Sequence, residues 1–232
     1  MLWYKGWLET RFRVLFMLLF AVFPVALALS GGHHLATTQH APTPVELAEA
    51  QRSTGFLAMY YSIIPLFLAG SGTNYAKKPG STYFTLSLPI SRLRLLATGA
   101  GSGMLATVGI FAVVSCTVWF GLGDDPGAVS LSNLFTYWAA LSVGTSGFYF
   151  LGVLLSTFLD DRVRGWISMF GVVFLRWFLS TVPVPAPLNV FDAMTSPLYP
   201  PFSFPWASMG ISLGVAAVLG WAALRVMETR EY

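Results

Sequence analysis

The serine of the segment Gly144-Thr145-Ser146-Gly147 is the first candidate for chemistry, because it lies between small residues inside a long apolar run. A buried serine becomes a nucleophile only when a base such as histidine lies within hydrogen-bonding reach and takes its proton. The chain has three histidines, His33, His34 and His40, and all of them lie in one polar stretch far from this serine. We therefore predict no catalytic residue here and interpret the small residues as sites of close helix packing.

Two other groups of polar residues have types that could bind a metal ion or transfer protons. The three histidines are common zinc ligands, but no cysteine or clustered carboxylate accompanies them, so solvated loop residues are the simpler interpretation. Asp124 and Asp125 stand beside Gly123 and Pro126, a pattern typical of a tight turn. We expect no metal and no cofactor on this chain, and metal binding by the histidines stays an open alternative.

Arg176 is the exception in apolar runs that are otherwise poor in ionisable residues. A charge inside a membrane-spanning segment commonly marks a transport pathway. An arginine near the end of a span can also extend its charged group to the membrane surface as an anchor. Asp192 and Glu49 are the carboxylates that could pair with it. Anchoring and gating both remain open for Arg176.

The segment 183–205 combines features that a helix or a free loop would not tolerate. It contains half of the chain's 14 prolines, which prevent one continuous helix. It also contains large apolar side chains, among them Phe191 and Tyr199, which need burial. We predict a re-entrant segment on the outer side, either a lid over a pathway or a packed cap, with Arg176, Phe191 and Tyr199 as pathway or gating candidates.

Long apolar runs supply the elements that must position these residues. The chain is 55% hydrophobic and only 10% charged, whereas a soluble domain carries about 25% charged residues. Most of the runs approach or exceed the roughly 20 residues that cross a bilayer as a helix. The sequence predicts an all-α integral membrane protein, a single domain over residues 1–232 with six transmembrane helices. The runs are 13–30, 55–72, 95–120, 134–159, 165–182 and 206–224.

Basic residues give this layout a direction. All of the 13 lysines and arginines except Arg52 and Arg176 fall in the gaps on the side of the N-terminus. Because basic loops stay in the cytoplasm, we expect both termini to be cytoplasmic. The high pI therefore requires no nucleic acid. Residues 1–12 read as a helix in the plane of the interface, and Thr43-Pro44 as the start of a helix that continues through Arg52 into the second run.

The cytoplasmic loop 73–94 is the most informative segment between runs. Residues 77–80 read as a turn, and residues 83–88 can form a short helix with apolar side chains partly exposed. Pro89 ends that helix, and Ser91 caps a new one that leads into the third run. An exposed apolar helix flanked by cations on the cytoplasmic side indicates a docking surface for a partner.

This segment resembles a signature of the type-two ABC transporter permease family, which lies between the second and third of six spans. The family pattern is Gly-Thr, four residues, Leu, one residue, Leu or Thr, Pro, Val or Ile, Ser, Arg. The interfacial first helix, the cytoplasmic termini and the re-entrant segment before the last span also fit the family. Where the family often has an acidic residue before this signature, this chain has Lys77-Lys78. The matching residues are Gly80, Ser81, Phe84, Thr85, Leu86, Leu88, Pro89, Ile90, Ser91 and Arg92.

The resemblance implies that the helix near 82–88 is a coupling helix seated in a groove of a cytoplasmic ATPase, and that a second inner turn at 160–164 touches the same partner. ATP binding would close two ATPase subunits and tilt the spans. The residues implied in ATPase coupling are Tyr83, Phe84, Leu86, Leu88, Pro89, Ser91, Arg92, Asp161 and Arg162.

The chain itself has no phosphate-binding loop, since no lysine directly follows a glycine. ATP and Mg are therefore expected on a separate ATP-binding-cassette ATPase, and this chain is expected not to be an enzyme. Six spans form half of a usual pathway, so a second permease subunit, identical or different, is implied. We expect a bacterial cell membrane. A six-span substrate-binding subunit of another transporter is the alternative function, and an intramembrane enzyme is a third class. The substrate is not readable.

Overall fold

The computed structural model is an all-helical bundle, and it describes residues 2–30, 44–69, 92–122, 130–198 and 203–229. No strand occurs among these residues, which confirms the all-α prediction. The long helices are α1 (Leu2–Ser30), α2 (Pro44–Leu68), α4 (Arg92–Leu122), α5 (Leu131–Gly144), α6 (Ser146–Phe158), α7 (Asp161–Thr181) and α9 (Trp206–Thr229). The short helices are η2 (Ala186–Leu188), α8 (Val190–Thr195) and η3 (Ser196–Leu198).

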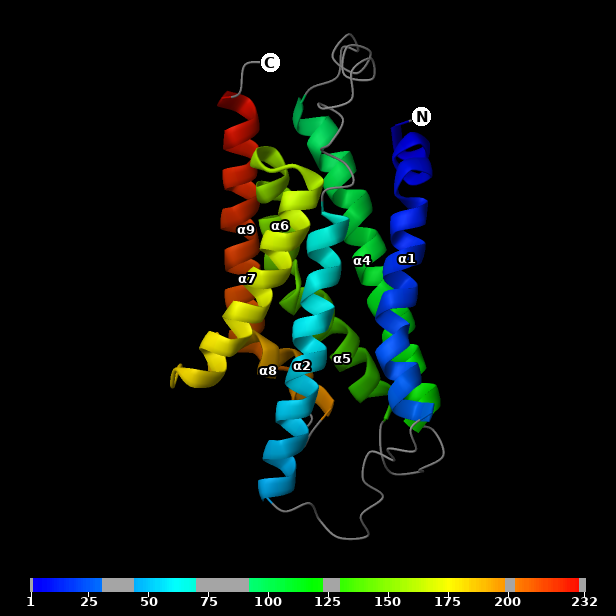
Figure 1. Ribbon diagram of the computed structural model, residues 1–232, viewed down its shortest axis with the longest axis vertical. Helices are drawn as coiled ribbons and strands as arrows, with labels where there is room; N and C mark the ends of the chain where they lie inside the picture. Colours follow the sequence, from blue (N-terminus) through cyan, green and yellow to red (C-terminus); the bar gives the residue numbers. More distant parts are fainter. Residues whose placement is uncertain (1, 31–43, 70–91, 123–129, 199–202, 230–232) are drawn as a thin grey trace.

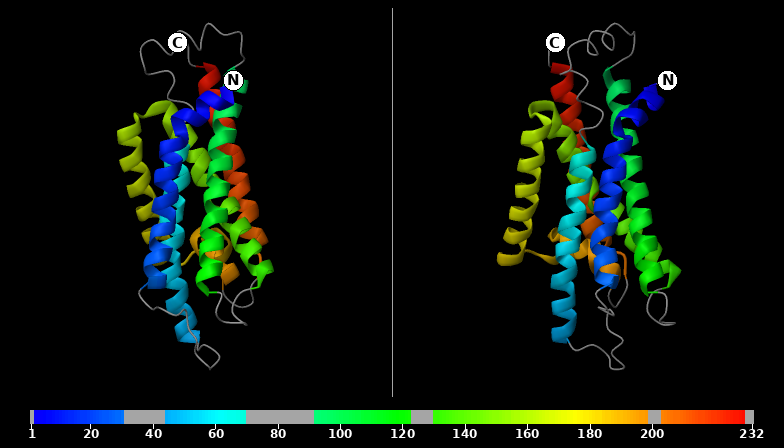
Figure 2. Two further views of the ribbon diagram at one scale, coloured as in Figure 1. Left: turned by 90° about the vertical axis from the view of Figure 1, so that its right-hand side faces the viewer. Right: turned by 45° about the vertical axis from the view of Figure 1, so that its right-hand side comes forward.

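The long helices lie side by side and alternate in direction along the bundle (Figures 1 and 2). Helices α1, α4 and α7 start at one end, where α9 finishes. We call it the basic end, because Arg92, Arg164 and Arg225 lie in the helical turns there. The short helix α8 lies at the opposite end, which we call the cap end (Figure 1).

Four helices of the described residues are long and apolar enough to cross a membrane. The second of them is α5 and α6 taken together, and Thr54–Leu68 of α2 is a shorter apolar helix. The four are Ala97–Phe120, Leu131–Phe158, Val163–Thr181 and Trp206–Val226.

Apolar side chains cover the outside of the bundle as well as its core. Of the residues in the apolar stretch of α5–α6, 67% are buried, whereas only 22% of those in the apolar stretch of α7 are. Trp166, Phe170, Phe174 and Trp177 form an exposed aromatic face on α7. Such a surface would be unstable in water, since soluble proteins expose only small contiguous apolar patches, and it fits contact with lipid.

Helix starts agree with the capping signals in the sequence. Helix α2 begins at Pro44 and runs through Arg52 into the second apolar run, as predicted. Helix α4 begins at Arg92, directly after the predicted cap residue Ser91. Helix α1 is continuous from Leu2, so residues 2–12 are helical and join the first apolar run without a break.

The fourth apolar run differs from the uninterrupted helix expected over 134–159, because it is broken at Thr145 into α5 and α6. A break inside a membrane is tolerated only if the freed backbone groups find partners within the protein. Here the carbonyl oxygen of Leu141 still accepts from the amide of Thr145 at 3.0 Å, and it accepts from the Thr145 hydroxyl as well, at 2.7 Å. The Ser146 hydroxyl donates to that of Val143 at 2.6 Å. These hydroxyl groups stabilise the bend locally.

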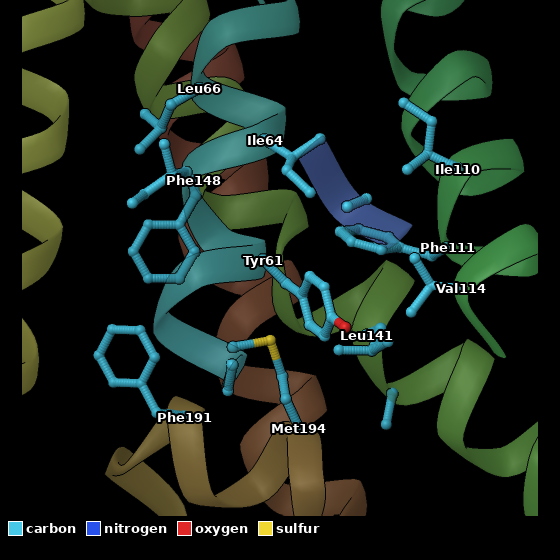
Figure 3. Packing of buried hydrophobic residues seen from close by; sticks show 14 of the residues in the cluster. Tyr61, Ile64, Leu66, Ile110, Phe111, Val114, Leu141, Phe148, Phe191 and Met194 are labelled. Atoms are coloured by element: carbon cyan, nitrogen blue, oxygen red, sulfur yellow. The ribbon is translucent and has the colours of Figure 1, made fainter. Parts of the chain in front are cut away.

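The described residues form a large hydrophobic core, whose centre lies between α2, α4 and α5 (Figure 3), and a smaller cluster around Tyr149 and Val153. Tyrosine hydroxyl groups link the helices at both places. The hydroxyl of Tyr60 donates to the carbonyl of Phe20 at 2.6 Å, and that of Tyr149 to the carbonyl of Ala100 at 2.7 Å. Tyr61 is also buried, at 1% exposure, but its hydroxyl has no partner among the described residues.

This contrast predicts that removing the two buried hydroxyl groups affects the free energy of unfolding differently. Tyr149→Phe loses a bond between α6 and α4 and should lower the free energy of unfolding by about 0.6–1.7 kcal/mol, the range of such bonds in membrane proteins. Tyr61→Phe removes an unsatisfied group and should leave stability equal or slightly higher. Titration with a denaturing detergent in mixed micelles measures both. Equal losses for the two variants would contradict the assignment of these hydrogen bonds.

Candidate functional site

The segment after α7 forms a cap, residues 186–198, made of η2, α8 and η3. The cap packs on α2, α5 and α9. Phe191 and Met194 are fully buried in it, at 0% exposure, and Met194 points from α8 into the core (Figure 3). The prediction that protein buries the apolar side chains of this segment is confirmed for these two residues.

Local sequence signals explain where the cap begins. Helix α7 ends at Thr181, shortly before Pro183 and Pro185, because proline cannot continue the backbone hydrogen-bond ladder. Asn189 then caps α8, with its side-chain oxygen accepting from the amide of Asp192. The prolines thus end one helix, and an asparagine starts the next.

An ion pair joins the cap to α7. Nη1 of Arg176 lies 2.9 Å from Oδ1 of Asp192, and the side chains are 10% and 51% exposed. Oδ2 of the same carboxylate accepts from Nδ2 of Asn189 at 2.6 Å. Asp192 is one of the two partners that the sequence suggested for Arg176. The arginine is thus neutralised within the protein by a carboxylate that solvent reaches.

The guanidinium of Arg176 reaches the cap by lying against Gly55 of α2. A Cβ atom on residue 55 would lie 2.7 Å from Cζ of Arg176 and closer still to Nη2. Any side chain larger than hydrogen at this position would therefore displace the guanidinium. Cζ of Arg176 also lies 5.8 Å from the centroid of the Phe191 ring, within the range of a cation–π interaction.

The cap also contacts the break in the fourth run. A Cβ on Gly144, the last residue of α5, would lie 2.9 Å from Sδ of Met194 and closer to its Cγ. The Phe191 ring packs against Phe148 of α6, with 5.7 Å between ring centroids (Figure 3). The cap therefore contacts both sides of the break at Thr145, and while Met194 holds this position only glycine fits at residue 144.

This arrangement supports positioning rather than bond chemistry. The Ser146 hydroxyl is engaged with a backbone carbonyl of its own turn, as described above. No group of three or more metal-ligating side chains occurs in the part of the chain that the structure describes. The three histidines lie outside that part. The contacts of Arg176 with Asp192 and of Met194 with Gly144 hold the cap on the bundle.

The predicted site residues fall into three groups. Arg176 and Phe191 are brought together at the cap end. Arg92 and Asp161 are the first residues of α4 and α7, and Arg162 follows in α7. The remaining predicted residues lie outside the described part of the chain: Tyr83, Phe84, Leu86, Leu88, Pro89, Ser91 and Tyr199.

Sequence reasoning missed three contributors to the site, namely Gly55, Asn189 and Met194. Asn189 could have been found, because an asparagine before a short apolar segment with Asp three residues on is a helix-cap pattern. Gly55 and Met194 act through contacts with distant parts of the chain, and no local pattern marks them.

Comparison of the chain with known protein families, with characterised proteins and with solved structures found no match.

Removal of either member of the ion pair should destabilise the protein unequally. Asp192→Ala leaves the Arg176 charge buried without a partner, a change that costs about 3–5 kcal/mol for fully buried pairs and less here because Asp192 is half exposed. Arg176→Met leaves a carboxylate that water can solvate and should cost clearly less. Unfolding free energies of both variants and of the double variant test this. A larger loss for Arg176→Met than for Asp192→Ala would contradict the ion-pair geometry.

Proposed function

We propose that this chain is the transmembrane permease subunit of an ATP-driven ABC exporter, coupled to a separate cytoplasmic ATPase. The observation that carries the proposal is the segment from Gly80 to Arg92, with its pattern of Leu86, Leu88, Pro89 and Ser91. The pattern resembles the ATPase-coupling signature of type-two ABC permeases. Its location between two apolar helices is where that family has it.

The arrangement of the helix ends supports this proposal. Helix α2 runs toward the basic end before the segment, and α4 starts at that end after it (Figure 1). The junction of α6 and α7, where Asp161 and Arg162 lie, is at the same end (Figure 1). Both predicted contacts with the ATPase would then face one partner on one side of the membrane.

In this proposal α1 and α2 complete six spans together with the four apolar helices named above. The basic end faces the cytoplasm, because arginines flank the helices there. The cap end faces outward, and the segment 183–205 is the re-entrant segment with Arg176, Phe191 and Tyr199 as gating residues. A second permease subunit completes the pathway, and the partner ATPase binds ATP and Mg.

The cap suits a gate on the outer side of an export pathway. The cap packs on α2 and α5 and covers the core at this end of the bundle. Its ion pair can open without leaving both charges in the membrane, since Asp192 is half exposed. A transporter needs such a two-state element, so that the pathway opens to one side at a time.

The test is copurification of an ATP-binding-cassette ATPase with this chain from the organism that encodes it. Replacing Leu86 and Leu88 by Asp puts charges on the predicted docking helix, and we expect at least a tenfold loss of bound ATPase, the factor that about 1.4 kcal/mol of lost binding free energy produces. The permease should keep its elution volume in detergent. Leu86→Met with Leu88→Met is the matched control, since methionine keeps an apolar contact of similar volume.

Undiminished copurification of the Asp variant would contradict the docking assignment. Binding of a ligand by the permease with no associated ATPase would instead support the alternative, a six-span substrate-binding subunit of another transporter.

A further inference from the structure

Three helices meet at one point near the cap end. Gly55 of α2 makes room for the guanidinium of Arg176 from α7, and that guanidinium holds Asp192 of α8 at 2.9 Å. The ion pair therefore depends on the position of α2, although α2 contributes no charge to it. A shift of α2 toward α7 would close the space that Gly55 leaves for the guanidinium.

Helix α2 joins the cap end to the segment that holds the predicted ATPase contacts, and Pro65 lies inside it near the end at Leu68. Its residues Ala58, Tyr61, Ile64 and Leu66 are buried at 0–1% exposure in the common core. Packed cores transmit displacement because they deform little. From Gly55 to Leu68 the helix spans about 20 Å, at 1.5 Å per residue. Leu68 is the last helical residue before the segment that holds the predicted ATPase contacts.

The cap is a small element whose attachment is easy to identify. Helix α8 has six residues. It packs directly on α2 and α5, with Met194 beside Gly144, and the Arg176 ion pair joins it to α7. If the ion pair opens, apolar packing is the main remaining contact between the cap and the neighbouring helices.

We infer that α2 is the lever that connects the ATPase to the cap, and that it acts by displacing Arg176 from its seat on Gly55. This inference rests on the proposed function for the ATPase half of the lever. Movement of the inner end of α2 shifts Gly55, the Arg176–Asp192 pair opens, and the cap is released. In the resting state the glycine seat keeps the pair closed and the cap in place.

The position of the cap can be followed by a disulfide across the contact between Met194 and Gly144. A cysteine at residue 194 places its sulfur near the present position of Met194 Cγ, beside the Cβ of residue 144, within the range of disulfide geometry. Gly144→Cys with Met194→Cys is made in a Cys116→Ser background, since Cys116 is exposed. The initial rate of disulfide formation under mild oxidant, in the purified permease in lipid nanodiscs, reports how often the cap is closed.

The first comparison needs no ATPase. Gly55→Ala and Asp192→Asn each disturb the ion pair, and we expect the crosslinking rate to fall by about fivefold or more, the lower bound of typical coupling between sites. Gly171→Ala is the matched control, because a Cβ there meets nothing within 4 Å, and it should leave the rate unchanged. If Gly55→Ala and Asp192→Asn crosslink as fast as the parent, the role of the glycine seat is overturned.

The second comparison uses the complex with the ATPase and a non-hydrolysable ATP analogue. The analogue should lower the crosslinking rate of the parent and have no further effect on Asp192→Asn, where the pair is already open. A rate in the parent that does not respond to the analogue, with the ATPase bound, overturns the lever while the proposed function stands. Absence of any bound ATPase overturns the proposed function and the lever together, while the first comparison still decides the role of Gly55.

Discussion

Polar groups inside the apolar bundle need partners within the protein, and most of the contacts described above meet this need, with the hydroxyl of Tyr61 as an exception among the described residues. At the break, the amide of Thr145 keeps its bond to the carbonyl oxygen of Leu141, and the hydroxyl of Ser146 donates to that of Val143. Arg176 is tolerated inside α7 because Asp192 and the ring of Phe191 lie beside its guanidinium. Tyrosine hydroxyl groups donate to carbonyl oxygens of neighbouring helices, as Tyr60 and Tyr149 do.

The break and the ion pair lie next to each other. The cap contacts the break through Met194 and Gly144, and it contacts α7 through Asp192 and Arg176. An intramembrane charge that is paired across two helices, beside an interrupted helix, is the kind of arrangement that transport pathways use. The proposal of a gated permease joins this cap end to the basic end, where the sequence carries its resemblance to an ATPase-coupling segment.

Much of the fold could be predicted because its signals are local. Apolar runs bounded by caps located the helices, and the starts at Pro44 and Arg92 agree with the predicted cap residues. The break at Thr145 could not be predicted, since an apolar run with glycines is equally compatible with a straight span. Gly144 shows its importance only when Met194 lies against it. The pairing of Arg176 with Asp192 was one of two options, because residues sixteen apart are brought together by the turn after α7 and not by helical spacing.

Gly55 illustrates the limit of sequence reasoning. In the sequence it is one of 22 glycines, in a stretch that no motif marks. Its role follows from the guanidinium of a residue more than one hundred positions away. The predicted coupling residues differ from Gly55 in that a sequence pattern marks them. Most of them lie outside the residues that the structure describes.

In the proposed function, the segment between α2 and α4 faces the cytoplasm, where an ATPase can bind it. A single cysteine in place of Lys78, in a Cys116→Ser background, tests this orientation with a membrane-impermeant thiol reagent. We expect no labelling in intact cells and rapid labelling once the cytoplasmic face is exposed in inverted vesicles. Rapid labelling in intact cells would place the segment outside and rule out ATPase binding to it.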